Sequence, residues 1–299
     1  MWVSLAFLSA ALLGFYDVAK KQALRENSVP IVLLLNTLFS SLIFLPAIIS
    51  ASFSLGWFEA TPFVEYSGTM GDHLLILVKS AIVLSSWIFG YIGIKHLPIT
   101  IVGPINATRP VLVLLGALLI FGERLNAMQW IGVVLAIFSI FLLSRSSRKE
   151  GIDFRHNIWI LAVAAAAVMG AVSGLYDRYI MTSLPPLFVQ SWYNLYQAVM
   201  MSVAVAVILI VQGKKSTHFH WSWAIPMISI LLSAADLAYL TALSRDEAMI
   251  SVVSMIRRSS VVVSFVCGAM FFREKNLRSK AIDLVLILIG MIFLWLGSK

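Results

Sequence analysis

Eight ionisable side chains interrupt long apolar stretches of this sequence. They are Asp17, Lys79, Arg109, Asp177, Arg178, Asp236, Arg257 and Arg258. A charged group at the centre of a membrane helix costs about 2.5–3.5 kcal/mol, so such a group normally faces a cavity or a partner. The arginines among them offer planar, paired donors that match the oxygens of a carboxylate or phosphate. These residue types therefore predict an anion-binding site within a membrane.

The composition is that of a membrane protein. Of 299 residues, 60% are hydrophobic and 12% are charged, and the mean hydropathy is +0.93. A soluble domain carries about a quarter charged residues, which excludes a water-soluble enzyme. The net charge of +8 comes from basic residues in short gaps between apolar runs, as in the loops of membrane proteins. A lipid bilayer is therefore the expected partner, and nucleic acid is not.

Ten apolar runs approach the roughly 20 residues that a spanning helix needs. The runs are 2–20, 30–50, 73–94, 99–121, 127–144, 157–180, 187–211, 222–243, 248–271 and 280–297. The predicted fold class is thus an all-α, multi-pass protein of the cell (inner) membrane, with ten transmembrane helices. Pro98, Pro104 and Pro110 predict a kink in the fourth helix, either as a bending point or as plain structure.

Short segments recur in the same order in the two halves of the chain. The segment Gly14-Phe15-Tyr16-Asp17 returns as Gly174-Leu175-Tyr176-Asp177, and Glu123 after the fourth run returns as Glu274 after the ninth. Further matched pairs are Pro30 with Pro186, Asn36 with Asn194, and Tyr91 with Tyr239. Because each half holds five helices, similar halves must enter the membrane in opposite senses. The sequence predicts two inverted five-helix repeats, residues 1–147 and 148–299.

The segment that closes the fourth predicted helix also carries a family resemblance. Gly122-Glu123-Arg124-Leu125, together with the two five-helix halves, resembles the drug/metabolite transporter superfamily and its EamA-like branch in particular. The second half keeps Glu274 but has Arg273 in place of the glycine. Members of the superfamily carry amino acids, nucleotide sugars, sugar phosphates, cations and other metabolites. The resemblance therefore implies a carrier of small molecules.

Alignment of the two glutamates predicts which helix faces meet. It places Asn106 opposite Arg257 and Arg109 opposite Ser260. Residues three apart share a helix face, so an inverted repeat turns both stripes toward one central cavity, which Arg258 can also reach. These residues are expected to bind the substrate. Three aromatic residues, which either line the cavity or pack the bundle, complete the predicted binding site: Trp87, Tyr91 and Tyr239.

The adjacent arginines resemble a basic pair known from relatives. Arg257-Arg258 is similar to the pair in the ninth helix of plastid phosphate translocators and some nucleotide-sugar transporters. In those relatives the pair holds phosphate with the help of a basic residue on the fourth helix. The resemblance assigns the helper's role to Arg109.

The acidic residues have two open interpretations. Asp17, Asp177 and Asp236 are expected to act in coupling or gating, as carboxylates whose protonation depends on burial and on the neighbouring arginines. In the alternative they simply neutralise the arginines, or Asp17 and Asp177 anchor helix ends at the interface. The pairing and coupling roles can coexist. Lys79 is expected to extend its amine to the membrane interface.

The leading hypothesis is a secondary transporter that moves a small, anionic, carboxylate- or phosphate-bearing metabolite by alternating access. No Gly-rich phosphate loop is present, so protons or a counter-substrate are expected to drive transport rather than ATP. The alternative is an exporter of amino acids or neutral metabolites whose arginines are structural. Enzyme activity, a metal and a cofactor are not expected, because the five histidines lack metal-site spacing and Cys267 is the single cysteine.

Overall fold

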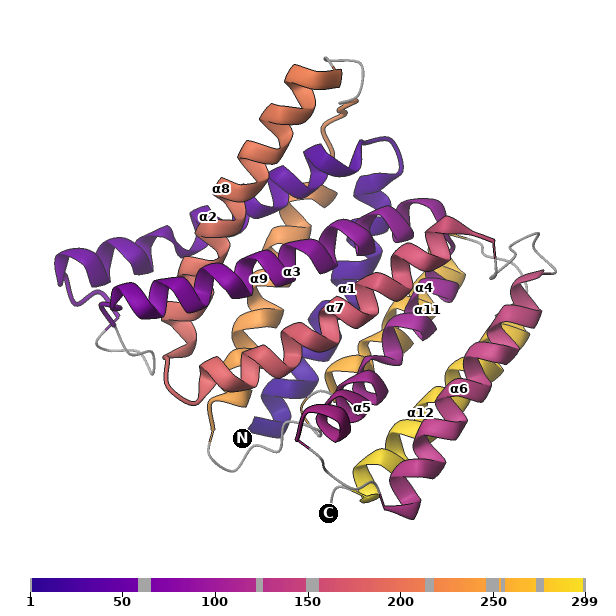
Figure 1. Ribbon diagram of the computed structural model, residues 1–299. Coiled ribbons are helices and arrows are strands. Elements are labelled where there is room, and N and C mark those ends of the chain that lie inside the picture. Colours follow the sequence, from indigo (N-terminus) through magenta and orange to yellow (C-terminus); the bar gives the residue numbers. More distant parts are fainter. Residues whose placement is uncertain are drawn as a thin grey trace.

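The computed structural model is built from helices throughout the residues that it describes (Figure 1). Those residues are 2–58, 66–121, 126–148, 156–212, 218–245, 253, 256–272 and 277–297. The helices are α1 (Trp2–Leu24), α2 (Val29–Phe53), α3 (Met70–His96), α4 (Ile99–Ala107), α5 (Arg109–Phe121), α6 (Ala127–Arg148), α7 (Ile158–Met181), α8 (Pro186–Gln212), α9 (Ala224–Leu243), α11 (Ser260–Phe271) and α12 (Leu277–Gly297).

Helix length and composition support the membrane class. Within the described ranges, seven helices are long and apolar enough to cross a membrane: α1, α2, α3, α7, α8, α9 and the Lys280–Gly297 part of α12. Ile99–Leu115 and Ala127–Leu143 form shorter apolar helices. These findings confirm an all-helical membrane protein. The count of ten spans stays a prediction, because the fourth predicted span is divided into α4 and α5 and part of the ninth lies outside the described residues.

Local sequence explains where several helices begin. Pro30 lies in the first turn of α2, where its missing N–H costs no hydrogen bond, and α8 begins at Pro186. At α3 the Thr69 hydroxyl accepts a hydrogen bond from the Asp72 backbone N–H at 3.3 Å, and the Asp72 carboxylate accepts one from the Thr69 backbone N–H at 2.8 Å. The Asn157 side chain caps α7 in a similar way. These caps fix the starts of two helices, α3 and α7, that carry predicted site residues.

The helical path is broken at corresponding positions in the two halves. One break follows α4 and the other precedes α11. Thr108 separates α4 from α5, and its hydroxyl donates to the Ile105 carbonyl at 2.7 Å. Ser259 precedes α11, and its hydroxyl donates to the Ile256 carbonyl at 2.6 Å. Such hydroxyl bonds compete with the regular helical pattern. The same offset that aligns Glu123 with Glu274 aligns both breaks and both acceptors.

The helices pack in a scheme that treats the two halves alike. Helix α1 packs on α9 and α11, while its counterpart α7 packs on α3 and on the α4–α5 pair. The counterpart helices α2 and α8, and likewise α6 and α12, pack against each other, and Figure 1 shows α6 and α12 side by side at one edge. The closest packed pairs of the described helices therefore recur when each helix is exchanged for its counterpart, as α1 on α9 recurs in α7 on α3.

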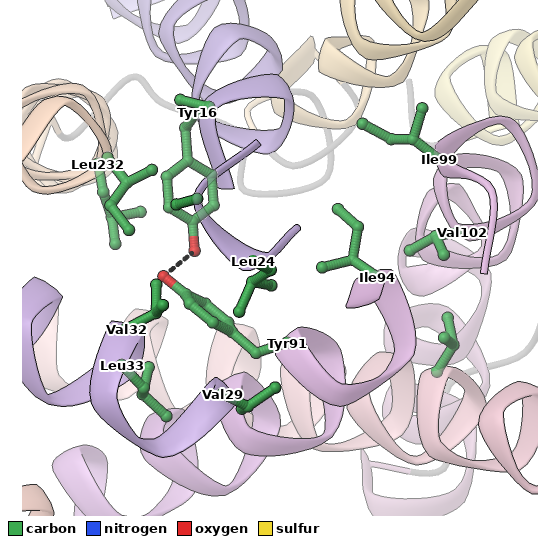
Figure 2. Close-up of a cluster of buried hydrophobic side chains, with 14 of the residues drawn as sticks. Tyr16, Leu24, Val29, Val32, Leu33, Tyr91, Ile94, Ile99, Val102 and Leu232 are labelled. Carbon is green, nitrogen blue, oxygen red and sulfur yellow. Dashed lines mark hydrogen bonds between the residues drawn. The ribbon is translucent and has the colours of Figure 1, made fainter. Parts of the chain in front are cut away.

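Large apolar side chains cover the outside of the bundle, and its inside holds both apolar and charged groups. Exposed positions include Phe7, Leu42, Val134, Leu161 and Ile210. Figure 2 shows part of the main buried cluster, in which the Tyr16 hydroxyl donates to that of Tyr91 at 3.3 Å among leucine, valine and isoleucine side chains. Lys20, Lys79, Asp177 and Asp236 are buried among these helices. An apolar exterior with charges inside is the arrangement expected in lipid.

Candidate functional site

A cavity of about 140 Å³ lies among the helices, and both halves of the chain contribute to it. All ten predicted site residues line it: Asp17, Trp87, Tyr91, Asn106, Arg109, Asp177, Asp236, Tyr239, Arg257 and Arg258. They come from α1, α3, α4, α5, α7 and α9 and from the residues just before α11. The structure thus brings together side chains that lie as far as 241 positions apart in the sequence. Arg178, by contrast, is exposed on α7.

Three ion pairs surround the cavity. Asp17 accepts a hydrogen bond from the Lys20 amine at 2.7 Å, Asp177 is paired with Lys79, and Asp236 is paired with Arg257. The second pair corrects the expectation for Lys79, whose amine meets a carboxylate inside the bundle and does not extend to the membrane interface. Only 4% of Lys79 is exposed, because α3 packs closely on α7 and leaves the amine no path outward.

Asp236 is held by both of its oxygens. One oxygen is paired with Arg257, and the other accepts a hydrogen bond from the Tyr193 hydroxyl at 2.7 Å. Tyr193 in turn accepts from the Gln190 amide at 3.3 Å. The same guanidinium lies over the Tyr239 ring, with its Cζ 4.1 Å from the ring centroid. Arg257 is therefore fixed by a carboxylate and an aromatic ring, as the pairing interpretation of the sequence required.

Arg109 has a different environment from Arg257. Its Nη2 donates to the Asn106 Oδ1 at 3.1 Å, and its buried Nε, like that of Arg257, has no hydrogen-bond partner among the described residues. Its guanidinium lies directly against Gly170 of α7, where a Cβ would come within 2.5 Å of the Arg109 Cζ. The absence of a side chain at Gly170 therefore makes the space that this guanidinium occupies.

Arg258 completes the group of arginines. No ion pair or hydrogen bond joins it to any other residue that the structure describes. It lines the same cavity as Arg109. The cavity therefore brings together two cations that lack a carboxylate partner in the described part of the chain.

A row of buried amides runs along α8 from the cavity. Gln190, Asn194 and Gln197 follow one another at helical spacing, and each is almost completely buried. Gln190 lines the cavity, whereas neither amide atom of Gln197 has a hydrogen-bond partner in the part of the chain that the structure describes. In the sequence, Asn194 stands out only as a repeat position, and the two glutamines were not predicted to belong to the site. Their spacing on an apolar helix was the available signal.

Other contributors to the site were also missed. Lys20 pairs with Asp17 and lies over the ring of Tyr16, with its Nζ 4.4 Å from the centroid. Tyr193 and Gly170 were not singled out. The sequence could not have identified them, because their roles depend on α8 facing α9 and on α7 facing α5.

Comparison with known proteins identifies the family. A sequence model of the EamA-like transporter family matches residues 1–145 and 157–296, two segments that together cover most of the chain. The chain belongs to the EamA-like transporter family. Membership makes it a membrane transporter of small molecules in a lipid environment, in a family of transporters rather than enzymes. The segment 122–125 that carried the resemblance, and Glu274, lie outside the described residues.

The fold agrees with this EamA-like assignment. One solved structure, described only as a crystal structure of a protein, is similar with a TM-score of 0.65 and 17% sequence identity. The similarity covers 99% of this chain and 98% of the other. At this identity the likeness shows the fold alone. No curated protein matches the chain in sequence.

Proposed function

We propose that the protein is a secondary transporter that binds a small anionic metabolite in the central cavity and releases it on the other side by alternating access. The observation that carries the proposal is the placement of Arg109, Arg257 and Arg258 around one cavity between the two halves. Guanidinium groups bind carboxylate and phosphate oxygens through paired hydrogen bonds. Buried arginines without a carboxylate partner are costly in a membrane unless a ligand compensates them.

The proposed architecture is ten spanning helices in two inverted repeats, residues 1–147 and 148–299, in the cell (inner) membrane. The packing scheme supports it, since the main packed pairs, such as α1 with α9 and α1 with α11, recur with the halves exchanged, as α7 with α3 and α7 with α5. The corresponding breaks at Thr108 and Ser259 support it as well. Transporters built from inverted repeats bind substrate at the repeat interface, often at discontinuous helices, and their halves rock around it.

The helix breaks lie beside the proposed ligands. Arg109 follows Thr108 directly, and Arg257 and Arg258 directly precede Ser259. A rotation at either break would move a guanidinium relative to the rest of the cavity. We assign these breaks as the bending points that accompany the exchange between outward and inward access.

The three aspartates are proposed to act in coupling or gating. Asp17, Asp177 and Asp236 each hold a cation of the cavity in this structure. A substrate that draws Arg257 away from Asp236 would leave a carboxylate that takes up a proton more readily. Proton coupling and exchange against a counter-substrate both remain compatible with this arrangement, and Trp87 and Tyr91 would line the substrate's path.

A second candidate function is the export of amino acids or neutral metabolites. The ion pair between Asp236 and Arg257 favours it, because a neutralised arginine is then structural. On this candidate the cavity recognises at most one carboxylate, and loss of Arg109 leaves binding of a neutral solute intact.

Ligand-induced stabilisation of the purified protein distinguishes the two candidates. A ligand that binds only the folded state raises the melting temperature. Phosphate, succinate, alanine and glycerol are added to the wild type, to an Arg109→Gln/Arg258→Gln double variant, and to Arg178→Gln as the matched control on the outer surface. The proposal expects an anion to stabilise the wild type and control but not the double variant. Stabilisation by alanine or glycerol that survives in the double variant would support the second candidate.

A further inference from the structure

The charges that line the cavity do not balance. Among the described residues, the lining contains five cations, Lys20, Lys79, Arg109, Arg257 and Arg258, and three carboxylates, Asp17, Asp177 and Asp236. Each carboxylate is already paired with one cation of this set. The three pairs use Lys20, Lys79 and Arg257. Arg109 and Arg258 remain, so the cavity has an excess of two positive charges.

Asp17 also attracts both arginines, but its charge is already matched by Lys20, and the other neighbours of the two arginines add none. Asn106 offers Arg109 a neutral amide oxygen, and Ser173 and Ser260 of the lining carry neutral hydroxyls. Neutral groups satisfy hydrogen bonds but leave the charge uncompensated. Because opposite charge is worth far more inside a protein than in water, a ligand with matching charge gains strongly from entering. A singly charged ligand would leave one guanidinium uncompensated.

We propose that the substrate carries two negative charges, which Arg109 and Arg258 bind while Arg257 stays with Asp236. This inference rests on the proposed function and makes its substrate class more specific. It also gives the adjacent arginines different roles, because Arg258 binds the substrate whereas Arg257 stays paired with Asp236. The cavity of about 140 Å³ is smaller than the roughly 300–1,000 Å³ of pockets for drug-sized ligands, so the dianion is small.

Two small dianions meet this description. A phosphate monoester has both charges on one group, so both guanidiniums would converge on it. A short dicarboxylate has the charges on separate groups, so each guanidinium would hold one end. Glycerol phosphate and succinate serve as probes for these two kinds of dianion. Glycerate and butyrate are the matching monoanions of similar size.

The position of Asn106 allows a direct test of the charge count. Its Oδ1 already accepts a hydrogen bond from Arg109, so Asn106→Asp places a carboxylate there with almost no change of shape. The new carboxylate would take Arg109 as its partner and reduce the excess from two charges to one. Arg258→Gln also reduces the excess by one charge, because it removes a cation instead of adding a carboxylate. Asn106→Ala removes the hydrogen bond without changing the charge.

The experiment measures dissociation constants of the purified protein for the four anions at pH 8, where the phosphate monoester is doubly charged. The wild type is expected to bind at least one dianion at least about tenfold more tightly than its singly charged partner. Asn106→Ala, which loses the hydrogen bond to Arg109, is expected to bind all four anions more weakly but to keep this preference. Asn106→Asp and Arg258→Gln are each expected to lose this preference or reverse it. Asn157→Asp, which adds the same charge at the cap of α7 outside the cavity, is the matched control and should behave as the wild type.

The outcomes separate this inference from the proposed function. Equal binding of mono- and dianions by the wild type overturns the inference and leaves an anion transporter in place. A dianion preference that persists in both Asn106→Asp and Arg258→Gln also overturns it. Failure of all four anions to bind, with binding of neutral solutes instead, overturns the proposed function as well. Because two variants change the charge independently, misfolding of one leaves the other to decide.

Discussion

Asp236 and Arg257 form an ion pair between α9 and the residues before α11, and each side chain is only 13% exposed. The pair joins α9 to the residues that directly precede the break in the chain path at Ser259. It neutralises one of the three arginines of the cavity. Breaking this pair would therefore both destabilise the bundle and expose a further positive charge in the cavity.

Replacement of either member of this pair should destabilise the protein more than replacement of both. Asp236→Asn leaves a buried guanidinium uncompensated and Arg257→Gln leaves a buried carboxylate, each costing about 3–5 kcal/mol. In the double variant no charge is left unpaired, so its loss of stability should be smaller than that of either single variant. Melting temperatures of the four proteins measure the coupling. Additive losses would show that the two groups do not depend on each other.

The lysine pairs should differ in their importance for stability. The side chains of Lys79 and Asp177 are 5% and 9% exposed, whereas those of Lys20 and Asp17 are 10% and 23% exposed and lie one helical turn apart. Lys79→Met is therefore expected to lower the melting temperature more than Lys20→Met, since it leaves the more deeply buried carboxylate without a partner. An equal or opposite order would mean that Lys79 does not hold Asp177 inside the bundle.

Gly170 should control the position of Arg109. A methyl group there would meet the guanidinium, while a methyl group at Gly174 on the same helix would have no neighbouring atom within 4 Å. Gly170→Ala is expected to weaken anion binding about tenfold or more, because the guanidinium must move, with little change in melting temperature. Gly174→Ala is the matched control. If both variants bind alike, Arg109 does not need the space beside Gly170.

The two helix breaks should respond differently to loss of their hydroxyl groups. Pro104 lies within α4 and Pro110 within the first turn of α5, so the break at Thr108 persists without the hydroxyl. No proline lies within the described residues around Ser259, so Ser259→Ala favours a continuous helix. Ser259→Ala should slow transport in proteoliposomes several-fold more than Thr108→Ala, with anion affinity retained. The reverse order would contradict the proposed bending points.

Along α8, the same substitution should have opposite effects at two positions. Gln197 has two buried amide atoms without a partner, whereas Gln190 donates to the Tyr193 hydroxyl. Gln197→Met should stabilise the protein by about 1 kcal/mol, because an unpaired buried polar group is removed. Gln190→Met should destabilise it, because Tyr193 loses a partner. A loss of stability at Gln197 would instead indicate that its amide has a partner in the membrane-embedded protein.

The cost of charge in a membrane made much of the candidate site predictable. Arg109, Arg257 and Arg258 interrupt apolar runs, and the alignment of the halves placed Asn106 and Arg257 at corresponding positions. That reasoning uses only composition and periodicity, and the same cavity holds all of these residues. The helical membrane class followed in the same way from the length of the apolar runs.

Properties that depend on packing between helices could not be predicted. The sequence left open which aspartate each arginine meets, and it placed the amine of Lys79 at the interface. Its pairing with Asp177 follows from the contact of α3 with α7. The break at Ser259 was also missed, because a serine hydroxyl gives a weaker sequence signal than the prolines around Thr108.

The most direct test of an anion carrier built on this cavity is uptake of labelled succinate and labelled glycerol phosphate into proteoliposomes. The wild type and Arg178→Gln, an exposed control outside the cavity, should show saturable uptake of at least one of them. Arg109→Gln, folded to the same melting temperature in detergent, should lose this uptake. Uptake by folded Arg109→Gln at the wild-type rate would contradict the account.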